Sequence, residues 1–525
     1  MNSTNIRPLV GLLGVLVAAL SADLNESVSA AALIDVRGTL GISADPGRWI
    51  DSLYVTGTAL GMAFAPWNAV TFTLRRFTLF AIGLACAATT LLAFAPNLQA
   101  ILTLRLIQGL SGGLTIPLLM TTALRVLAPP IRLYGLALYA LTITFSPNIS
   151  ISFVAIWTDV VNDWHLVFLQ AIPLDAVAAV LVWYGLPQDM PRYERLRQFD
   201  WRGALLIVVG VGSLTTLLLH GDHEDWFNSP TISLLALASV VAVPLLILNE
   251  WRHPLPLLKL QILGRGNFAY GIIGLALFLT IGLTSSVVPQ QYLVEIQGYR
   301  PLQEQALDLL LSLGQFALLP AAAFLLDHKW VDARAVMLCG LGLVLAACLG
   351  CAQIDASWNR DQFQFWQYLQ MVGQPMIAVS LLMFATNTVK GAEEGPFASA
   401  LFNFTRGLAD AGSTWFLELV TRWCGALHSD RLVDQVGQNW SRTIQAQTLL
   451  PQDPAPLLPN GQPSATGSLQ QFAHMIELQV SVMTTADIFL LMAVLCGVFV
   501  FLTLVLPVRT YPPRILLTKR SSSNA

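Results

Sequence analysis

Residues 231–249 read TISLLALASVVAVPLLILN, a predominantly apolar stretch without a charged side chain. A bilayer core about 30 Å thick is crossed by roughly 20 such residues in an α-helix, so this stretch is long enough to span a membrane. The whole chain has the same character, because 55% of its 525 residues are hydrophobic and only 11% are charged, whereas soluble proteins carry about 25% charged residues. The composition predicts a polytopic membrane protein.

Similar apolar stretches recur along the chain, and we interpret fourteen of them as transmembrane helices of an all-α fold. They cover residues 9–33, 50–72, 78–96, 101–125, 134–157, 165–186, 202–220, 231–249, 268–291, 305–326, 335–352, 364–386, 396–424 and 485–507. The first, fifth and thirteenth stretches carry polar residues, so we expect them to score weakly in hydropathy.

Composition and motifs argue against several functional classes. The net charge is −3 and there is no basic run, so a nucleic-acid partner is not expected. The chain contains no GxxxxGK[ST], HExxH or GxSxG pattern, which leaves no sign of an ATP site, a zinc protease or a serine hydrolase. We therefore expect neither an enzyme nor a metal or cofactor.

The distribution of basic residues predicts the orientation. Most of the 28 Lys and Arg residues fall in loops on one side of the predicted helices, and the positive-inside rule places that side, with both termini, in the cytoplasm. Residues 425–484 then form a long loop on the opposite side. Its middle, 450–467, reads as irregular chain and its flanks read as helical. The loop is either a docking surface or a solvated insertion without a role.

The first predicted helix contains Asp23 and Glu26, three residues apart and so on one face, with Asn25 between them. Ionisable residues within membrane helices usually face a cavity, a partner or a transport pathway. One reading is that the pair binds and releases a proton. The alternative is that the residues cap a bend or face a water-filled vestibule.

The fourth predicted helix contains Arg105, Gln108, Gly109 and Gly113. An arginine at membrane depth needs an acceptor, and two glycines four residues apart allow another helix to approach closely. The alternative for Arg105 is a side chain that extends to the membrane surface.

Three further groups of polar residues are candidates for a substrate cavity or a gate. Asn403, Arg406 and Asp410 lie in the thirteenth predicted helix, where the last two are spaced to form an ion pair. Such a pair is either structural or exchanges partners during transport. Pro147 with Asn148, and Gln290 with Gln291, lie beside proline breaks; these side chains either line a substrate path or satisfy the kinks.

Several motifs resemble the 14-helix drug:proton antiporters of the major facilitator superfamily, of the EmrB/QacA type, and EmrB-like permeases most closely. RLIQG at 105–109 matches the RxxQG signature of that family, and NFTR at 403–406 and DWFNS at 225–229 are also similar. The chain departs from the family at Asn25, which stands where the family has its proton-linked aspartate. It also lacks the acidic loop residue expected after the second helix, where it reads PWNAV at 66–70, and the glycines of the fifth helix.

The resemblance implies a major facilitator fold of two six-helix bundles, 1–190 and 265–525, with two inserted helices in 191–264. It implies proton-driven efflux of hydrophobic or amphipathic small molecules by alternating access across the inner membrane of a bacterium. It also implies a tripartite pump with a periplasmic adaptor and an outer-membrane channel, with 425–484 as the candidate contact.

Under this reading Asp23, Glu26 and Arg105 couple transport to protons. The substrate cavity or gate would involve Asn25, Gln108, Gly109, Pro147, Asn148, Gln290, Gln291, Asn403, Arg406 and Asp410. Three alternatives stay open: an exporter of one native compound such as a fatty acid, siderophore or metabolite, a transport-inactive receptor or scaffold, and a polytopic membrane enzyme. For the last of these the sequence offers no catalytic cluster.

Overall fold

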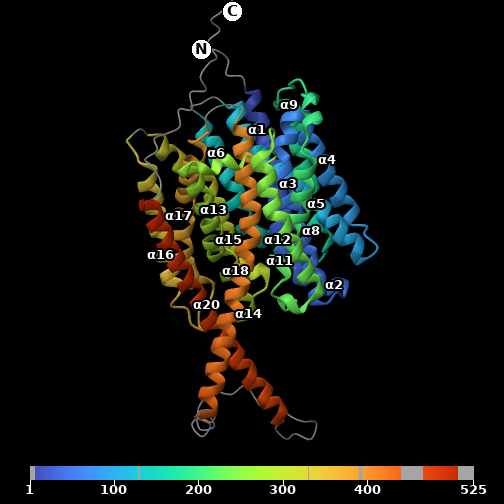
Figure 1. Cartoon of the computed structure of the whole chain (residues 1–525). Helices are drawn as coiled ribbons and strands as arrows, with labels where there is room; N and C mark the ends of the chain where they lie inside the picture. The colour runs from blue at the N-terminus through green and yellow to red at the C-terminus, as the bar shows by residue number, and fades with distance from the viewer. Residues whose placement is uncertain (1–5, 128–130, 329, 390–393, 439–464, 506–525) are drawn as a thin grey trace, which may run out of the picture.

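The computed structural model describes residues 6–127, 131–328, 330–389, 394–438 and 465–505, and over these ranges it contains helices and no strand. The helices run side by side in one bundle (Figure 1). The first part of the chain forms α1 (Arg7–Ala31), α2 (Leu33–Leu40), α3 (Ala44–Phe72), α4 (Leu74–Leu92), α5 (Leu98–Val126), α6 (Arg132–Thr144), α7 (Ser146–Val154), η2 (Ala155–Val160), α8 (His165–Leu169) and α9 (Ala171–Gly185).

The remaining helices form a middle segment and a second half. The middle segment comprises η3 (Tyr193–Gln198), α10 (Trp201–Leu206), η4 (Ile207–Val211), α11 (Gly212–His220), η5 (Trp226–Asn228), α12 (Pro230–Arg252) and η6 (Leu260–Gly264). The second half comprises α13 (Gly266–Gly282), η7 (Leu283–Ser285), α14 (Val287–Glu295), α15 (Pro301–Asp327), α16 (Ala333–Cys351), α17 (Arg360–Thr386), α18 (Gly395–Gln438) and α20 (Ala465–Val505).

Each of the fourteen predicted segments coincides with a helix or a broken helix in the described part of the chain. Eleven helical segments there are long and apolar enough to cross a membrane, and α6 with α7 and η2, bent by 46°, makes a twelfth. α3 and α18 do not reach that apolarity, although both pack among the spanning helices. A helix surrounded by other helices rather than by lipid can carry polar side chains toward its neighbours. The weak hydropathy predicted for the first segment was wrong, since α1 passes the same test.

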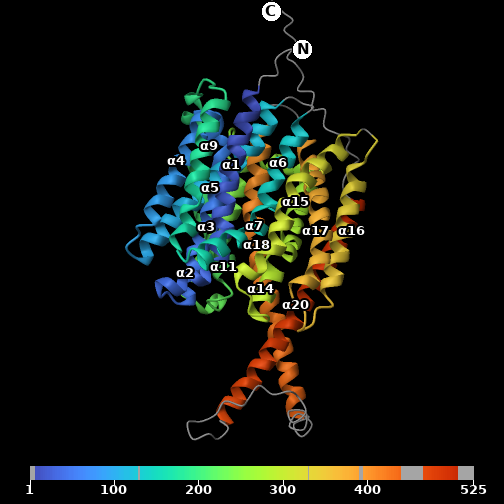
Figure 2. The same cartoon turned by 180° about the vertical axis from the view of Figure 1, so that it is seen from behind.

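The two halves lie side by side, with the middle segment against both (Figures 1 and 2). α11 contacts α3 of the first half and α18 of the second half. The halves meet directly where α15 packs on α6 and α7, and where α18 packs on α3 and α5. The predicted boundaries after residues 190 and 264 fall in connecting segments between helices, and the division into domains there stays a prediction.

Glycines bring α3 and α5 unusually close together. A Cβ atom on Gly109 would lie 2.1 Å from the carbonyl oxygen of Tyr54, and one on Gly113 would lie 2.1 Å from that of Thr58. From the other side, Gly57 and Gly61 on α3 meet the backbone of α5 in the same way. The predicted close-packing face of Gly109 and Gly113 is thus confirmed, and its partner is a matching glycine pair.

α18 and α20 extend well beyond the bundle. Both figures show the two helices leaving it together at one end and diverging; we call these extensions the arms, and that end the arm end. α1 begins at the opposite end. The helical flanks predicted for 425–484 are present, since α18 continues to Gln438 and α20 starts at Ala465. Most of the irregular middle, 450–467, lies outside the described residues.

Candidate functional site

The first feature of the site is a buried ion pair between the two halves. Asp23 on α1 lies 3.2 Å from the guanidinium of Arg406 on α18, and their side chains are only 8% and 5% exposed. One Asp23 oxygen, Oδ2, has no hydrogen-bond partner in the described part of the chain. Asp23 therefore holds a charge partner from the other half while keeping one oxygen free.

Arg406 is held by several further groups. Its Nη1 donates to the Thr142 hydroxyl at 2.8 Å and approaches the Tyr139 hydroxyl at 3.4 Å, both on α6. Asp410, one turn further along α18, lies 3.9 Å from Nε, so the pair predicted within the helix exists but is longer than the contact with Asp23. A guanidinium offers five donors in a fixed fork, and here the fork bridges α18, α1 and α6.

Asn403 belongs to the same network. It is fully buried, accepts from the Tyr139 hydroxyl at 2.7 Å and donates to the Ser399 carbonyl at 2.9 Å. The amide thus fixes Tyr139 beside Arg406 and adds a second link between α6 and α18.

Arg105 forms a separate buried cluster within the first half. It is fully buried and donates to Asn25 Oδ1 at 3.2 Å, Gln108 Oε1 at 2.8 Å and Ser29 Oγ at 2.6 Å. Asp51 lies 3.6 Å away, and the Tyr54 ring is 4.2 Å from the guanidinium. These contacts answer the question left by the sequence: Arg105 lies among acceptors in the bundle and does not extend to the surface.

Acidic groups outnumber basic ones where the two clusters meet. Glu26 is half-buried, forms no ion pair in the described part of the chain, and lies within electrostatic reach of Asp23, Asp51 and Asp410. Arg105 and Arg406 are the two guanidinium groups paired with carboxylates of this set. Four carboxylates face two positive charges, and a buried charge without a partner is costly. The site is therefore suited to binding protons.

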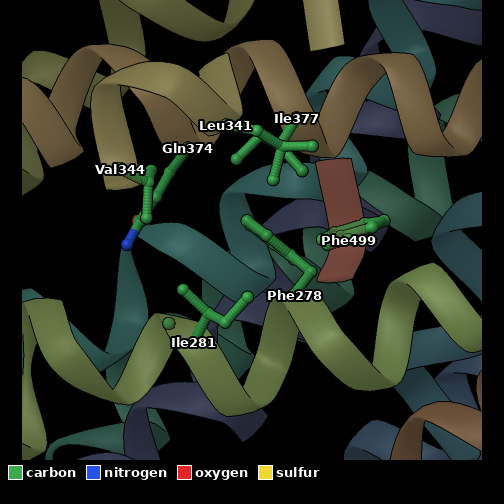
Figure 3. A pocket seen from close by; sticks show the side chains of 8 residues that line it. Phe278, Ile281, Leu341, Val344, Gln374, Ile377 and Phe499 are labelled. Carbon is green, nitrogen blue, oxygen red and sulfur yellow. The ribbon is translucent and has the colours of Figure 1, made fainter. Parts of the chain in front are cut away.

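Each half contains a small pocket between helices in equivalent positions. One pocket lies among α1, α3, α4, α5 and α9, and includes Asn25, Gln108 and Asp175. The other lies among α13, α16, α17 and α20. In Figure 3, Phe278 and Phe499 approach one another across this pocket, with Gln374 at its edge. Both have room for about one water molecule. The recurrence at the first, third, fourth and sixth main helices of each half fits a repeated bundle.

The proline breaks differ in their surroundings. Pro147 is half-buried at the bend between α6 and α7, and Asn148 Nδ2 donates to the Thr144 carbonyl at 2.8 Å, so this amide satisfies part of the kink. Gln290 approaches Asp308 at 3.5 Å, whereas Gln291 is exposed.

Sequence reasoning missed Tyr139, Thr142, Asp51, Glu304 and Asp308. The first two are neutral polar residues that no charge pattern singles out. Asp51 falls one residue inside the predicted span 50–72, next to its assumed boundary. Glu304 falls just before the span predicted at 305–326, although its four-residue spacing from Asp308 was a signal that both share one helix face.

Comparisons with known proteins identify the family. Residues 15–413 match the Major Facilitator Superfamily. Multidrug export protein EmrB of Escherichia coli (strain K12) is 25% identical over 79% of this chain and 80% of its own length. Fatty acid resistance protein FarB of Neisseria gonorrhoeae is 24% identical over 79% and 80%.

Solved structures support the same fold. The proton:xylose symporter XylE, bound to 6-bromo-6-deoxy-D-glucose, superimposes with a TM-score of 0.54 at 12% identity, covering 95% of this chain and 97% of that chain. The chain is therefore a multi-pass membrane protein that belongs to the Major Facilitator Superfamily.

Proposed function

We propose that this protein exports hydrophobic or amphipathic small molecules in exchange for protons. The observation that carries the proposal is the ion pair of Asp23 and Arg406, buried where the two halves meet. A contact of this kind depends on the protonation of the aspartate, because a neutral carboxylic acid no longer attracts the guanidinium as an anion does. Proton binding at Asp23 is thereby linked to the arrangement of the halves.

Alternating access requires contacts that can open in turn at either end. At the arm end, Arg300 of the second half contacts Asp35 and Asp159 of the first half. At the opposite end, the Ser399 hydroxyl donates to the Pro117 carbonyl at 3.2 Å. The structure thus holds the halves together on both sides of the Asp23–Arg406 pair. Protons and substrate need only favour different open states for exchange to follow.

The substrate class is taken from the relatives, since EmrB is named for multidrug export. We assign this chain the same class of cargo.

Proteoliposomes that contain the full chain test the proposal, with ethidium as the probe and an imposed pH gradient. The wild type should move ethidium against its gradient only when the pH gradient is present. Asp23→Asn and Glu26→Gln should lower this coupled movement, whereas Glu194→Gln, at an exposed position, should not. Coupled movement at the wild-type level in both site variants would refute the assignment of these carboxylates.

A second candidate function is export of one native compound, a fatty acid, which the relationship to FarB favours. The same proteoliposomes loaded with oleate distinguish the two. Transport of oleate without ethidium would support the fatty-acid exporter. Transport of neither, with intact folding, would support a transport-inactive receptor or scaffold.

We further propose that the protein lies in a bacterial inner membrane with both termini in the cytoplasm and the arms in the periplasm. The arms project from the bundle, so they present a surface that a periplasmic adaptor, and through it an outer-membrane channel, would contact. Deletion of 430–480 should abolish copurification of an adaptor. Full export with intact copurification would contradict this assignment.

A further inference from the structure

α15 carries two deeply buried carboxylates that the site described above does not use. Glu304 is 1% exposed and Asp308 is 2% exposed, and their spacing places them one turn apart on one face of the helix. Neither forms an ion pair within the described part of the chain. Asp308 Oδ2 lies 3.5 Å from the Gln290 amide, and Glu304 Oε2 has no hydrogen-bond partner among the described residues.

The charged groups nearest in the chain and on the packed helices are engaged elsewhere. α15 packs on α6, α7, η2 and α17. Arg300, just before α15, contacts Asp35 and Asp159. Arg360 of α17 donates to the Gln303 carbonyl and approaches Asp361. Arg132 of α6 lies at the far end of its helix, and α7 carries no charged residue. The two carboxylates therefore face each other without a cation.

Two contacts fix how α15 lies against α7. The rings of Phe145 and Phe316 meet edge to face at 4.9 Å, and the Leu302 amide donates to Asp159 at 2.9 Å. Helices joined at these two points are antiparallel, so Ser152 lies level with Asp308. Asn148 lies one turn further from the arm end than Ser152, level with Ser312.

At this register, polar groups without hydrogen-bond partners lie on both sides of the boundary between the halves. The buried Ser152 hydroxyl and the Asn148 Oδ1 atom, both on α7, have no hydrogen-bond partner in the described part of the chain. Buried polar atoms in proteins are nearly always satisfied. Unpartnered buried polar atoms at the same level as two unpaired carboxylates indicate a site that a bound proton completes, because a protonated carboxyl group can donate to them.

We propose that Glu304 and Asp308 form a second proton-binding site, between α7 and α15, which exchanges protons with the arm-end side. The step is the binding of H⁺ by a carboxylate oxygen, followed by its release, and no other bond changes. Burying a carboxylate without a cation is costly, so closure over the pair favours the form with a bound proton. The Arg300 contacts with Asp35 and Asp159 lie one helical turn from Glu304, toward the arm end. Proton binding by this pair is independent of the proposed function. The inference rests on that function only for the statement that the bound proton drives export.

Infrared difference spectroscopy of the full chain in lipid vesicles tests the site without any transport. The wild type should show a protonated-carboxyl C=O band whose intensity changes between acidic and alkaline medium. Glu304→Gln and Asp308→Asn should each remove a component of that change. Asp361→Asn, an acid 72% exposed at the same end of the neighbouring helix, should leave it. Because Asp23 and Glu26 can contribute their own component, the test is the difference between wild type and variant: a pH-dependent change equal to that of the wild type in both site variants, or a band constant at every pH, would overturn the proposal.

A transport measurement then separates this inference from the proposed function. With ethidium and an imposed pH gradient, Glu304→Gln and Asp308→Asn should lower coupled movement by about tenfold, a usual size for a coupling effect. Ethidium exchange without the gradient should continue, because glutamine and asparagine mimic the protonated acids. Loss of both activities with an altered unfolding temperature would indicate a structural role and overturn the inference. A wild type that moves no probe refutes the proposed function but leaves the infrared result standing.

Discussion

The guanidinium of Arg406 lies 3.2 Å from the carboxylate of Asp23, although 383 positions separate the two residues in the chain. α1 and α18 belong to different halves, so this contact forms only when the halves are assembled. Two further N–H groups of the guanidinium donate to the hydroxyl and the carbonyl of Thr142 on α6. One side chain thereby connects three helices at the centre of the protein.

The fork geometry of Arg406 predicts that lysine cannot replace it. Lysine keeps the charge but cannot bond Asp23 and Thr142 together in the same plane. A hydrogen bond to a charged group contributes about 1.5–3 kcal/mol, so Arg406→Lys should reduce proton-driven ethidium movement by about tenfold or more. Arg197→Lys, at an exposed position, serves as the control. Wild-type movement in Arg406→Lys would show that charge alone suffices.

The glycine contact between α3 and α5 predicts a loss of stability in Gly109→Ala. The added methyl group would lie 2.1 Å from a backbone oxygen of α3, which cannot move without separating the helices. Overpacking of this kind costs about 1–3 kcal/mol, and thermal unfolding in detergent should show a lower midpoint. Gly83→Ala on α4 has nothing within 4 Å and should leave the midpoint unchanged or raise it. An equal response of the two variants would contradict the close packing.

The contacts of Arg300 predict how readily the arm end opens. The Arg300 side chain is 55% exposed, and exposed ion pairs contribute only about 0–1 kcal/mol, so Arg300→Ala should favour opening a few-fold. The measurement is the rate at which an impermeant maleimide labels Ser312→Cys, with the six natural cysteines replaced.

Arg360→Ala is the matched control for that experiment, because among the described residues Arg360 bonds to Gln303 and Asp361 of its own half. Its labelling rate should equal that of the parent. Equal rates in Arg300→Ala and the parent would mean that the contacts with Asp35 and Asp159 do not hold this end closed.

His223 predicts a pH dependence of stability. It lies in the turn after α11, beside Arg48 and 3.4 Å from Glu418. Partial burial, and then the charge of Arg48, lower the pKa of His223 from its ordinary value near 6.5. The unfolded chain therefore binds the proton more readily, and stability rises with pH. This contribution is complete above the unfolded pKa and is lost as the pH falls below it.

Thermal unfolding at about pH 7.5 and about pH 5.5, on either side of that pKa, provides the check. The wild type should lose more stability on acidification than His223→Gln. His474→Gln, an exposed histidine on α20, should behave like the wild type. A larger acid sensitivity in His223→Gln would reverse the sign of the argument.

The helices were largely predictable because length and apolarity suffice to identify a span. Arg105 was predictable as a buried residue because Gln108 and the glycines share its helix. The pairing of Arg406 with Asp23 was not, since spacing within one helix indicated only Asp410. The helix that supplies the partner of Arg406 is decided by packing between the halves. A local sequence pattern does not show such a contact.

The continuity of α18 was also missed, because the helical flank predicted after residue 425 was placed in a loop, separate from the thirteenth span. The predicted span ended at residue 424 because the apolar pattern ends there, whereas the helix continues to Gln438. Apolarity reports contact with lipid or with other helices, and beyond the bundle a helix no longer needs it. Glu304 was left outside the predicted span 305–326 for a related reason. A span boundary placed by hydropathy excludes charged residues, even where packing buries them.

A single unbroken helix runs from Arg406 to the end of the arm. At 1.5 Å per residue the distance from Arg406 to Gln438 is about 48 Å. A small rotation of α18 near the ion pair is therefore enlarged at the far end of the helix. A tilt of a few degrees near the pair would sweep the tip through several ångströms. A rearrangement at Asp23 and Arg406 would therefore displace the tip of the arm, well beyond the bundle.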